Sequence, residues 1–188
     1  MVPDDLQRLE DELDAAERDA DALVAGMSEA IGSWRPRPES WSIAECLDHL
    51  ATGNRVYLTA MREAAARGRA HNKHRRRPAT PGLVGGWFVS WLEPPVKPRM
   101  RGRAPKKIRP RPSPALGDAY ASFKASQREV REFLRANGDL DLAGVRFRNP
   151  FIPGVRFSLA TGLHVIPAHE RRHLWQAWNV RRAAPSPH

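Results

Sequence analysis

Apolar residues recur every three or four positions over the first part of the chain. The stripe consists of Leu6, Leu9, Leu13, Ala16, Ala20, Leu23 and Met27. This spacing places the apolar side chains on one face of a long helix, and the acidic residues between them occupy its other faces. The segment "GSWRPRPES" that follows breaks this helix. The sequence therefore opens with an amphipathic helix that has a strongly acidic surface.

A second helical pattern begins near "SWSIAECLDHL", with Ser40 or Ser42 as the side-chain cap. Glu45 follows Ser42 by three residues, which is the spacing of a capping box. The stripe that we expect to face the core is Ile43, Leu47, Leu50, Asn54, Tyr57 and Met61. Asn54 is the polar member of this stripe and needs a partner if it is buried.

Two further helices are predicted in the second half of the chain. The third begins in "PSPALGDAY", with Ser113 as N-cap and Pro114 at the first helical position, and ends at Asn137-Gly138. The fourth runs from about Ser158 through "LATGLHVIPAHERRHLWQAWNV", and Pro167 either kinks it or marks its true start. The segment "VRFRNPFIPGVRF" between them is typical of an extended connection.

Four long helical patterns without a convincing set of strands predict an all-α fold, a four-helix bundle in one domain over residues 1–188. Residues 67–112, between the second and third helices, form a segment too long for a tight turn. We expect a crossover that lets these two helices run in the same direction. Short apolar pieces such as "GLVGGWFVSWL" indicate that the crossover is partly ordered and covers one end of the bundle.

Charge is concentrated in this crossover. Residues 67–111 hold fourteen basic residues against one acid, Glu93, so the segment carries +13 while the whole chain carries +10. The basic residues are Arg67, Arg69, Lys73, Arg75, Arg76, Arg77, Lys97, Arg99, Arg101, Arg103, Lys106, Lys107, Arg109 and Arg111. Such a segment can contact nucleic acid or an anionic membrane surface, but no nucleic-acid motif accompanies it. The alternative that we favour is a solvated flap that pairs with the acidic first helix.

The remaining bulk features indicate a cytoplasmic protein. The single cysteine, Cys46, cannot form an internal disulfide, and the acidic first residues do not resemble a signal peptide. The longest apolar run, residues 82–92, is far shorter than the roughly 20 residues that span a bilayer.

The segment "HERRHLWQAW" contains the His-Glu-x-x-His spacing of zinc metalloproteases. On a helix, His169 and His173 project from the same face and can bind one metal. A protease of this type takes its third ligand downstream, yet no acidic residue follows Glu170, and Gln176 and Asn179 occupy the positions of the extended motif. His188 is the last histidine and lies at the terminus. The ligand count therefore argues against a protease.

A third ligand must then come from upstream. His71 and His74 lie among arginines, where like charge disfavours a cation, and His164 points to the other side of its helix. His49 remains, and small side chains such as Gly53 beside it leave space for a site. Spacing alone leaves both possibilities open, a three-histidine metal site or histidines with structural roles. Imidazole ligands suit zinc, nickel and iron alike.

Two short motifs resemble the DinB-like superfamily, whose members combine W-S-x-x-E-x-x-x-H-L with a C-terminal H-x-x-x-H-x-x-Q helix. Here they are "WSIAECLDHL" and "HERRHLWQAW". The resemblance implies a bundle with up-down-down-up topology, often a homodimer, with His49, His169 and His173 as ligands of a divalent metal. It also implies relatives such as bacillithiol and mycothiol S-transferases and a mycothiol-dependent maleylpyruvate isomerase.

The function that we expect from this resemblance is activation of a low-molecular-weight thiol for attack on an electrophilic small molecule. Three protein ligands leave an open position on a metal, which is typical of catalytic sites. The alternatives are a metal-dependent hydrolase and a non-catalytic binding module whose basic loop contacts anionic partners.

Several residues near the motifs are weaker candidates for a role at the site. Glu170 lies about 100° around the helix from His169, so a salt bridge at the helix surface or core edge is favoured over a catalytic base. Gln176 can orient a ligand, and Asn54 either faces the cleft or satisfies a loop carbonyl. Cys46 is expected to act as a small buried hydrophobe, and Trp41, Trp175 and Trp178 as packing residues.

Overall fold

The computed structural model of the chain describes residues 3–95 and 105–185, and within them the fold is mostly helical. Its elements are α1 (Asp4–Val24), α2 (Glu29–Ser33), α3 (Ile43–Ala70), α4 (Gly82–Leu92), the 3-10 helix η2 (Lys106–Ile108), α5 (Leu116–Ala136), β1 (Arg146–Arg148), β2 (Arg156–Ser158) and α6 (Leu159–Ala183). The predicted all-α class is therefore confirmed, with one small two-stranded sheet added.

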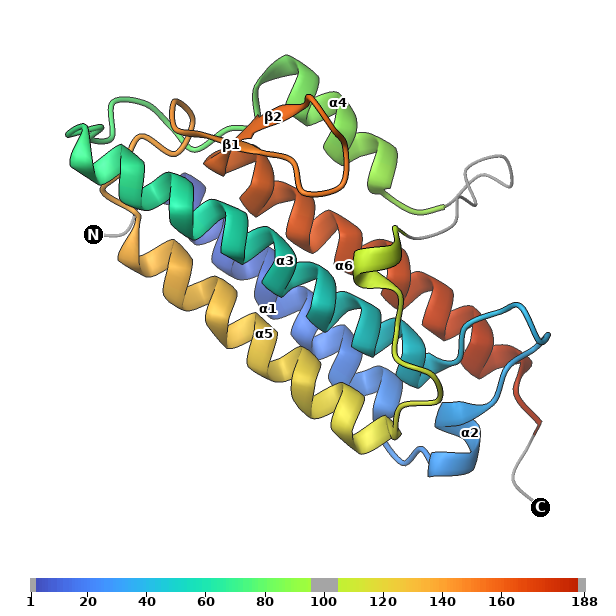
Figure 1. Cartoon of the computed structure of the whole chain (residues 1–188). Coiled ribbons are helices and arrows are strands. Elements are labelled where there is room, and N and C mark those ends of the chain that lie inside the picture. The colour runs from blue at the N-terminus through green and yellow to red at the C-terminus, as the bar shows by residue number, and fades with distance from the viewer. Residues whose placement is uncertain (1–2, 96–104, 186–188) are drawn as a thin grey trace.

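The four long helices lie side by side (Figure 1). Helix α3 packs against α5 and α6, and α1 packs against the same two helices. In Figure 1, α1 and α6 run toward the lower right, whereas α3 and α5 run toward the upper left. The segment between α3 and α5 contains α4 and η2, which lie on the outside of the long helices.

The apolar stripe of α1 faces the core as its spacing predicts as far as Leu23, whereas Met27 lies beyond the end of the helix. Leu6, Leu9, Leu13, Ala16, Ala20 and Leu23 are all buried. On α3, the side chains of Ile43, Leu47 and Leu50 are fully buried. Each large aliphatic side chain that is removed from water in this way contributes roughly 1.5–3 kcal/mol.

The starts of α3 and α6 are set by serine caps. At α3, Ser42 Oγ accepts a hydrogen bond from the Glu45 backbone N–H, and the Glu45 carboxylate accepts one from the Ser42 N–H, so the capping box is confirmed. At α6, Ser158 Oγ accepts from the Thr161 N–H. Because Pro167 lies inside this helix, the alternative that it marks the start of the helix is wrong.

The predicted start of α5 is wrong. The N-cap is Ala115 and not Ser113, Pro114 is outside the helix, and Ser113 has a positive φ of 46°. The Leu116 N–H instead donates to the Glu29 carboxylate at 2.7 Å. Glu29 belongs to α2, a short helix that ends at the start of the segment expected to break α1, so a contact from elsewhere in the chain replaces the local cap.

The extended connection predicted between the last two long helices is an antiparallel hairpin of β1 and β2. Its register pairs Arg146 with Ser158, Phe147 with Phe157, and Arg148 with Arg156. Helix α4 packs against α6 next to this hairpin, with the Phe88 and Phe157 rings 5.0 Å apart. The apolar piece of the crossover is therefore a helix.

The crossover and the acidic first helix are joined at Arg75, whose guanidinium binds the Asp5 carboxylate at 2.6 and 2.7 Å. This contact agrees with the expected pairing of basic loop and acidic helix. Lys97, Arg99, Arg101 and Arg103 lie outside the described residues. Within residues 3–95 and 105–185, none of the helices combines the length and apolar character needed to cross a bilayer.

Candidate metal centre

The three histidines singled out in the sequence meet between α3 and α6. Each of His49, His169 and His173 offers one ring nitrogen, and these three nitrogen atoms lie within 4.8 Å of one another. The ring centroids are 4.4 to 4.9 Å apart. Among the described residues this is the one group of three or more His, Cys, Asp or Glu side chains that could hold a metal ion. Two helices distant in sequence thus bring the candidate ligands together.

Hydrogen bonds to the Nδ1 atoms orient two of these rings. Nδ1 of His49 lies 2.5 Å from the Ile108 carbonyl oxygen, so this nitrogen carries the proton and donates it. Nδ1 of His173 lies 3.1 Å from Gln176 Oε1 and donates to it in the same way. A neutral imidazole that donates from Nδ1 keeps a lone pair on Nε2. Both Nε2 atoms are therefore in the form that binds a metal.

The spacing of the ring nitrogens fits a shared ion. Nε2 of His49 lies 3.1 Å from Nε2 of His169. Two imidazole nitrogens on one tetrahedral ion, each bound at about 2.0–2.1 Å, are separated by about 3.3 Å. The three residues thus fit a divalent cation by donor type, and the His49–His169 pair fits it also by distance.

Burial keeps these imidazoles neutral. It lowers the pKa of His49 to about 4, against a smaller opposite effect of the hydrogen bond to Ile108. Burial, the neighbouring histidines and the positive charge of Arg172 hold the pKa of His173 well below its usual range, and the pKa of His169 is lowered similarly. Because only the neutral ring binds a metal, the three rings are at neutral pH in the form that could accept one.

A short part of the crossover fixes His49 from outside the bundle. The Ile108 carbonyl that accepts the His49 proton belongs to η2. Three residues later, the backbone N–H and the Nε of Arg111 both donate to the Asp48 carboxylate, each at 2.8 Å. Asp48 is next to His49 on α3 and is itself buried. These contacts hold the crossover against the part of α3 that carries His49.

Replacing Asp48 by Ala is expected to lower metal affinity by about 10- to 100-fold, the usual cost of losing a group that orients a ligand. The reason is that Ile108 is no longer held against His49. Arg111→Ala removes the guanidinium but keeps the backbone N–H, so its effect should be smaller. Competition with a chromogenic chelator measures both affinities. Equal affinity of Asp48→Ala and the unaltered protein would contradict this role.

Trp41 and Gly53 shape the walls of the centre. The centroid of the Trp41 ring lies 4.7 Å from the centroid of the His49 ring and 5.6 Å from that of the His173 ring. A methyl group in place of the Gly53 hydrogen would lie 3.4 Å from Cε1 of His169, in van der Waals contact, so this position lines the His169 ring. His49 is only 1% exposed, whereas His169 and His173 are half-buried. Access to the centre is therefore from the side of α6.

Glu170 does not form the salt bridge expected at a surface or core edge with any residue that the structure describes. It is fully buried, and its carboxylate accepts hydrogen bonds from Asn54 Nδ2 at 2.8 Å and Gln127 Nε2 at 2.9 Å. Burial raises the pKa of Glu170 to about 7, although both hydrogen bonds oppose this shift. The carboxyl thus joins α3, α5 and α6 inside the bundle.

The other candidates divide between the centre and the core. Gln176 contacts His173 as expected. Asn54 reaches neither the cleft nor a loop carbonyl, since its amide donates to Glu170 and to Ser126 Oγ. Cys46 is fully buried among apolar residues. His164 Nε2 lies 3.0 Å from the Ala79 carbonyl oxygen and away from the group of three, and His188 lies outside the described residues.

Sequence reasoning missed three contributors to the centre. These are the Ile108 carbonyl, the Asp48–Arg111 contact and the position of Trp41 against two of the histidine rings. Trp41 and Asp48 stand inside the first motif, "WSIAECLDHL", so their closeness to His49 was the available signal. No comparable signal marked Ile108.

Comparison with known proteins places the chain in a family. No curated protein matches it. The model of the DinB superfamily matches residues 12–177, a span that includes α3, the crossover, most of α6 and all three histidines. Because the match extends over most of the sequence, the chain belongs to the DinB superfamily.

Proposed function

We propose that this protein is a metal-dependent thiol S-transferase, with His49, His169 and His173 as ligands of zinc, nickel or iron. The observation that supports it is the convergence of three neutral imidazoles whose remaining surroundings are partly open. A divalent ion with three protein ligands keeps an open position, where it favours the thiolate form of a bound thiol, which is the nucleophile. Family membership and the histidine group together fit a metal-dependent enzyme.

Residues around the histidines would orient the metal ligands and line the space for the thiol and the electrophile. Ile108 and Gln176 hold the rings of His49 and His173 through their Nδ1 protons. Trp41 supplies a flat apolar wall against the same two rings. Arg172 adds a positive charge close enough to lower the pKa of His169 and His173, which favours an anionic thiol or an electrophile with a carboxylate.

The proposal includes the architecture around the site. We infer one domain arranged as an up-down-down-up four-helix bundle, in which the crossover brings Ile108 to His49. The directions of the four long helices in Figure 1 support this topology. The predicted homodimer stays a prediction.

A thiol screen tests the proposed reaction. The metal-loaded protein is mixed with a chromogenic electrophile and a panel of low-molecular-weight thiols, and formation of the C–S bond is followed. We expect turnover that needs both a thiol and the metal, that is lost in His49→Ala and that is kept in His164→Ala. Metal-dependent hydrolysis without a thiol would replace the proposal by a hydrolase. Metal binding without turnover of any substrate would favour a binding module.

A further inference from the structure

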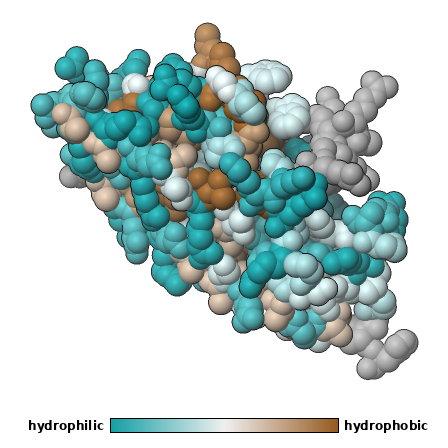
Figure 2. Space-filling model, in the orientation of Figure 1, coloured by the Kyte–Doolittle hydropathy of each residue, from teal (hydrophilic) through white to brown (hydrophobic). Residues whose placement is uncertain are grey.

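The outer face of α4 is apolar and exposed. The helix contains no charged residue. Leu83 is 95% exposed, Val84 76%, Trp87 69% and Trp91 41%. Leu83, Trp87 and Trp91 are four residues apart, so they form one stripe along the helix. Figure 2 shows hydrophobic atoms projecting over α4 from a face that is otherwise mostly hydrophilic. Contiguous apolar surface of this kind marks an interaction site.

The opposite face of α4 is firmly packed, so the helix cannot turn its stripe inward. The Phe88 ring lies 5.0 Å from that of Phe157. A Cβ at Gly85 would lie 2.4 Å from Thr161 Oγ1, so only glycine allows α4 to approach α6 this closely. Thr161 Oγ1 also donates a hydrogen bond to the Pro81 carbonyl oxygen at 2.9 Å. The stripe is therefore held in its exposed position.

The neighbouring hairpin presents three arginines on its outer face. Arg146, Arg148 and Arg156 are exposed, whereas Phe147 and Phe157 between them point inward and are buried. The register places Arg148 directly opposite Arg156. Like charges in opposed positions destabilise a strand pair. Within the described part of the chain, none of the three guanidiniums forms a hydrogen bond or ion pair with another residue. Among the described residues, no carboxylate compensates the charge of this face.

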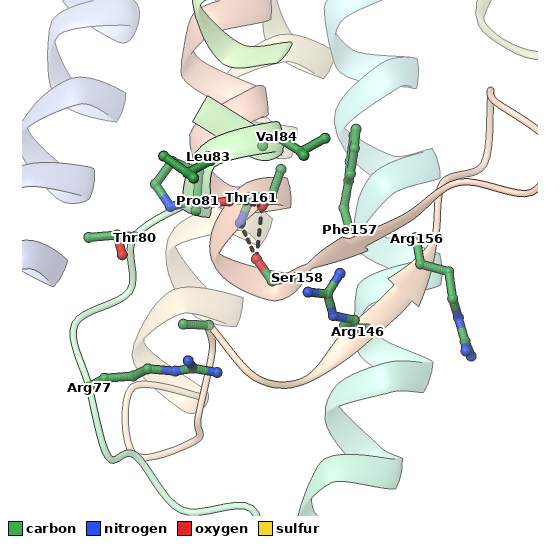
Figure 3. A pocket seen from close by; sticks show the side chains of 13 residues that line it. Arg77, Thr80, Pro81, Leu83, Val84, Arg146, Arg156, Phe157, Ser158 and Thr161 are labelled. Carbon is green, nitrogen blue, oxygen red and sulfur yellow. Dashed lines mark hydrogen bonds between the residues drawn. The ribbon is translucent and has the colours of Figure 1, made fainter. Parts of the chain in front are cut away.

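The start of α4 and two of the three hairpin arginines border the same depression. It is lined by Leu83 and Val84 of α4 and by Arg77, Arg146 and Arg156. Figure 3 shows the arginines coming from the crossover loop and from both strands, below the start of α4. Arg77 lies 3.5 Å from Asp141, at the long end of hydrogen-bond distances. Positive charge thus lies beside Leu83 and Val84, at the start of the apolar face of α4.

We propose that this combined surface, formed by Leu83, Val84, Trp87, Trp91, Arg146, Arg148 and Arg156, binds the surface of an anionic lipid bilayer. Apolar side chains of an interfacial helix enter the boundary between headgroups and acyl chains, where tryptophan is favoured. Guanidiniums beside them bind lipid phosphates. A second copy of the chain fits less well, because it would offer the same uncompensated arginines. The proposal is independent of the reaction at the metal centre.

Vesicle sedimentation of the full-length protein tests this surface. We expect binding to phosphatidylcholine vesicles that contain phosphatidylglycerol and much weaker binding to phosphatidylcholine alone. The double variant Arg146→Gln/Arg156→Gln should lower the partition coefficient by about fivefold for each charge removed. Leu83→Ser/Trp87→Ser should lower it on the order of tenfold or more.

A matched charge control distinguishes vesicle binding by this surface from vesicle binding caused by the net positive charge of the whole chain. Arg8 and Arg128 are exposed residues of α1 and α5, so Arg8→Gln/Arg128→Gln removes the same charge elsewhere. It should leave vesicle binding within twofold of the unaltered protein. An equal loss in this control would overturn the proposal, as would equal binding to neutral vesicles. The proposal would also be overturned by a different pair of results. In these, the unaltered protein does not bind vesicles but forms a dimer in analytical ultracentrifugation, and Leu83→Ser/Trp87→Ser dissociates that dimer.

Discussion

Replacing His49 by Ala is expected to abolish stoichiometric binding of a divalent metal. The variant removes one of three imidazoles that converge between α3 and α6 and leaves only the pair on α6. Loss of an orienting group alone costs about 10- to 100-fold in affinity, so loss of a ligand should exceed this range. Elemental analysis of the purified protein should fall from about one ion per chain to background levels.

His164→Ala is the matched control for His49→Ala. His164 lies on α6 like two of the candidate ligands, but its Nε2 contacts the Ala79 carbonyl oxygen. This variant should retain about one ion per chain, as the three-histidine site requires only the other residues. Full metal content in His49→Ala, together with an unchanged circular dichroism spectrum, would eliminate the three-histidine centre.

The largest loss of stability is expected for Glu170→Ala. This change removes a fully buried carboxyl that accepts hydrogen bonds from Asn54 and Gln127. Two buried amides lose their acceptor and a cavity opens between three helices. Together these effects should lower the free energy of unfolding by on the order of 2–5 kcal/mol. Urea denaturation followed by circular dichroism measures the change, with the exposed Glu132→Ala as a control that should stay within about 0.5 kcal/mol.

Glu170→Gln distinguishes a structural carboxyl from a catalytic one. Gln127 Oε1 and Asn54 Oδ1 have no hydrogen-bond partner among the described residues. Rotation of the Gln127 amide would present its oxygen to the new NH2 group, so this variant should lose much less stability than Glu170→Ala. Retained turnover is expected. A folded, metal-loaded Glu170→Gln without turnover would instead assign the carboxyl a direct part in the reaction.

The features that the sequence predicted correctly are mostly local. The Ser42–Glu45 capping box depends on two residues three positions apart, and it is present with both hydrogen bonds. The spacing of His169 and His173 needs only helical geometry to place them on one face. The position of His49 beside them is a long-range property, and the sequence indicated it through resemblance to a family and not through spacing alone.

The features that sequence analysis missed depend on tertiary contacts. Ser113 satisfies the local rule for an N-cap, but the Glu29 carboxylate of α2 takes that role at Leu116. Ile108 acts through its carbonyl group, which every residue has, so no side-chain pattern could identify it. Glu170 stood in a sequence typical of a metal-binding helix, yet its partner amides lie on α3 and α5. In each case the partner comes from another helix or from the crossover.

The separation of His49 and His169 along the chain gives the centre a further consequence. The two residues are 120 positions apart, and the chain contains one cysteine, so an internal disulfide cannot join such distant segments. A metal ion held by both imidazoles would act as a reversible cross-link that closes this long loop. Closure of a loop removes conformational entropy from the unfolded chain, by an amount that grows with loop length. Metal supply would then control how strongly the folded state is favoured over the unfolded chain.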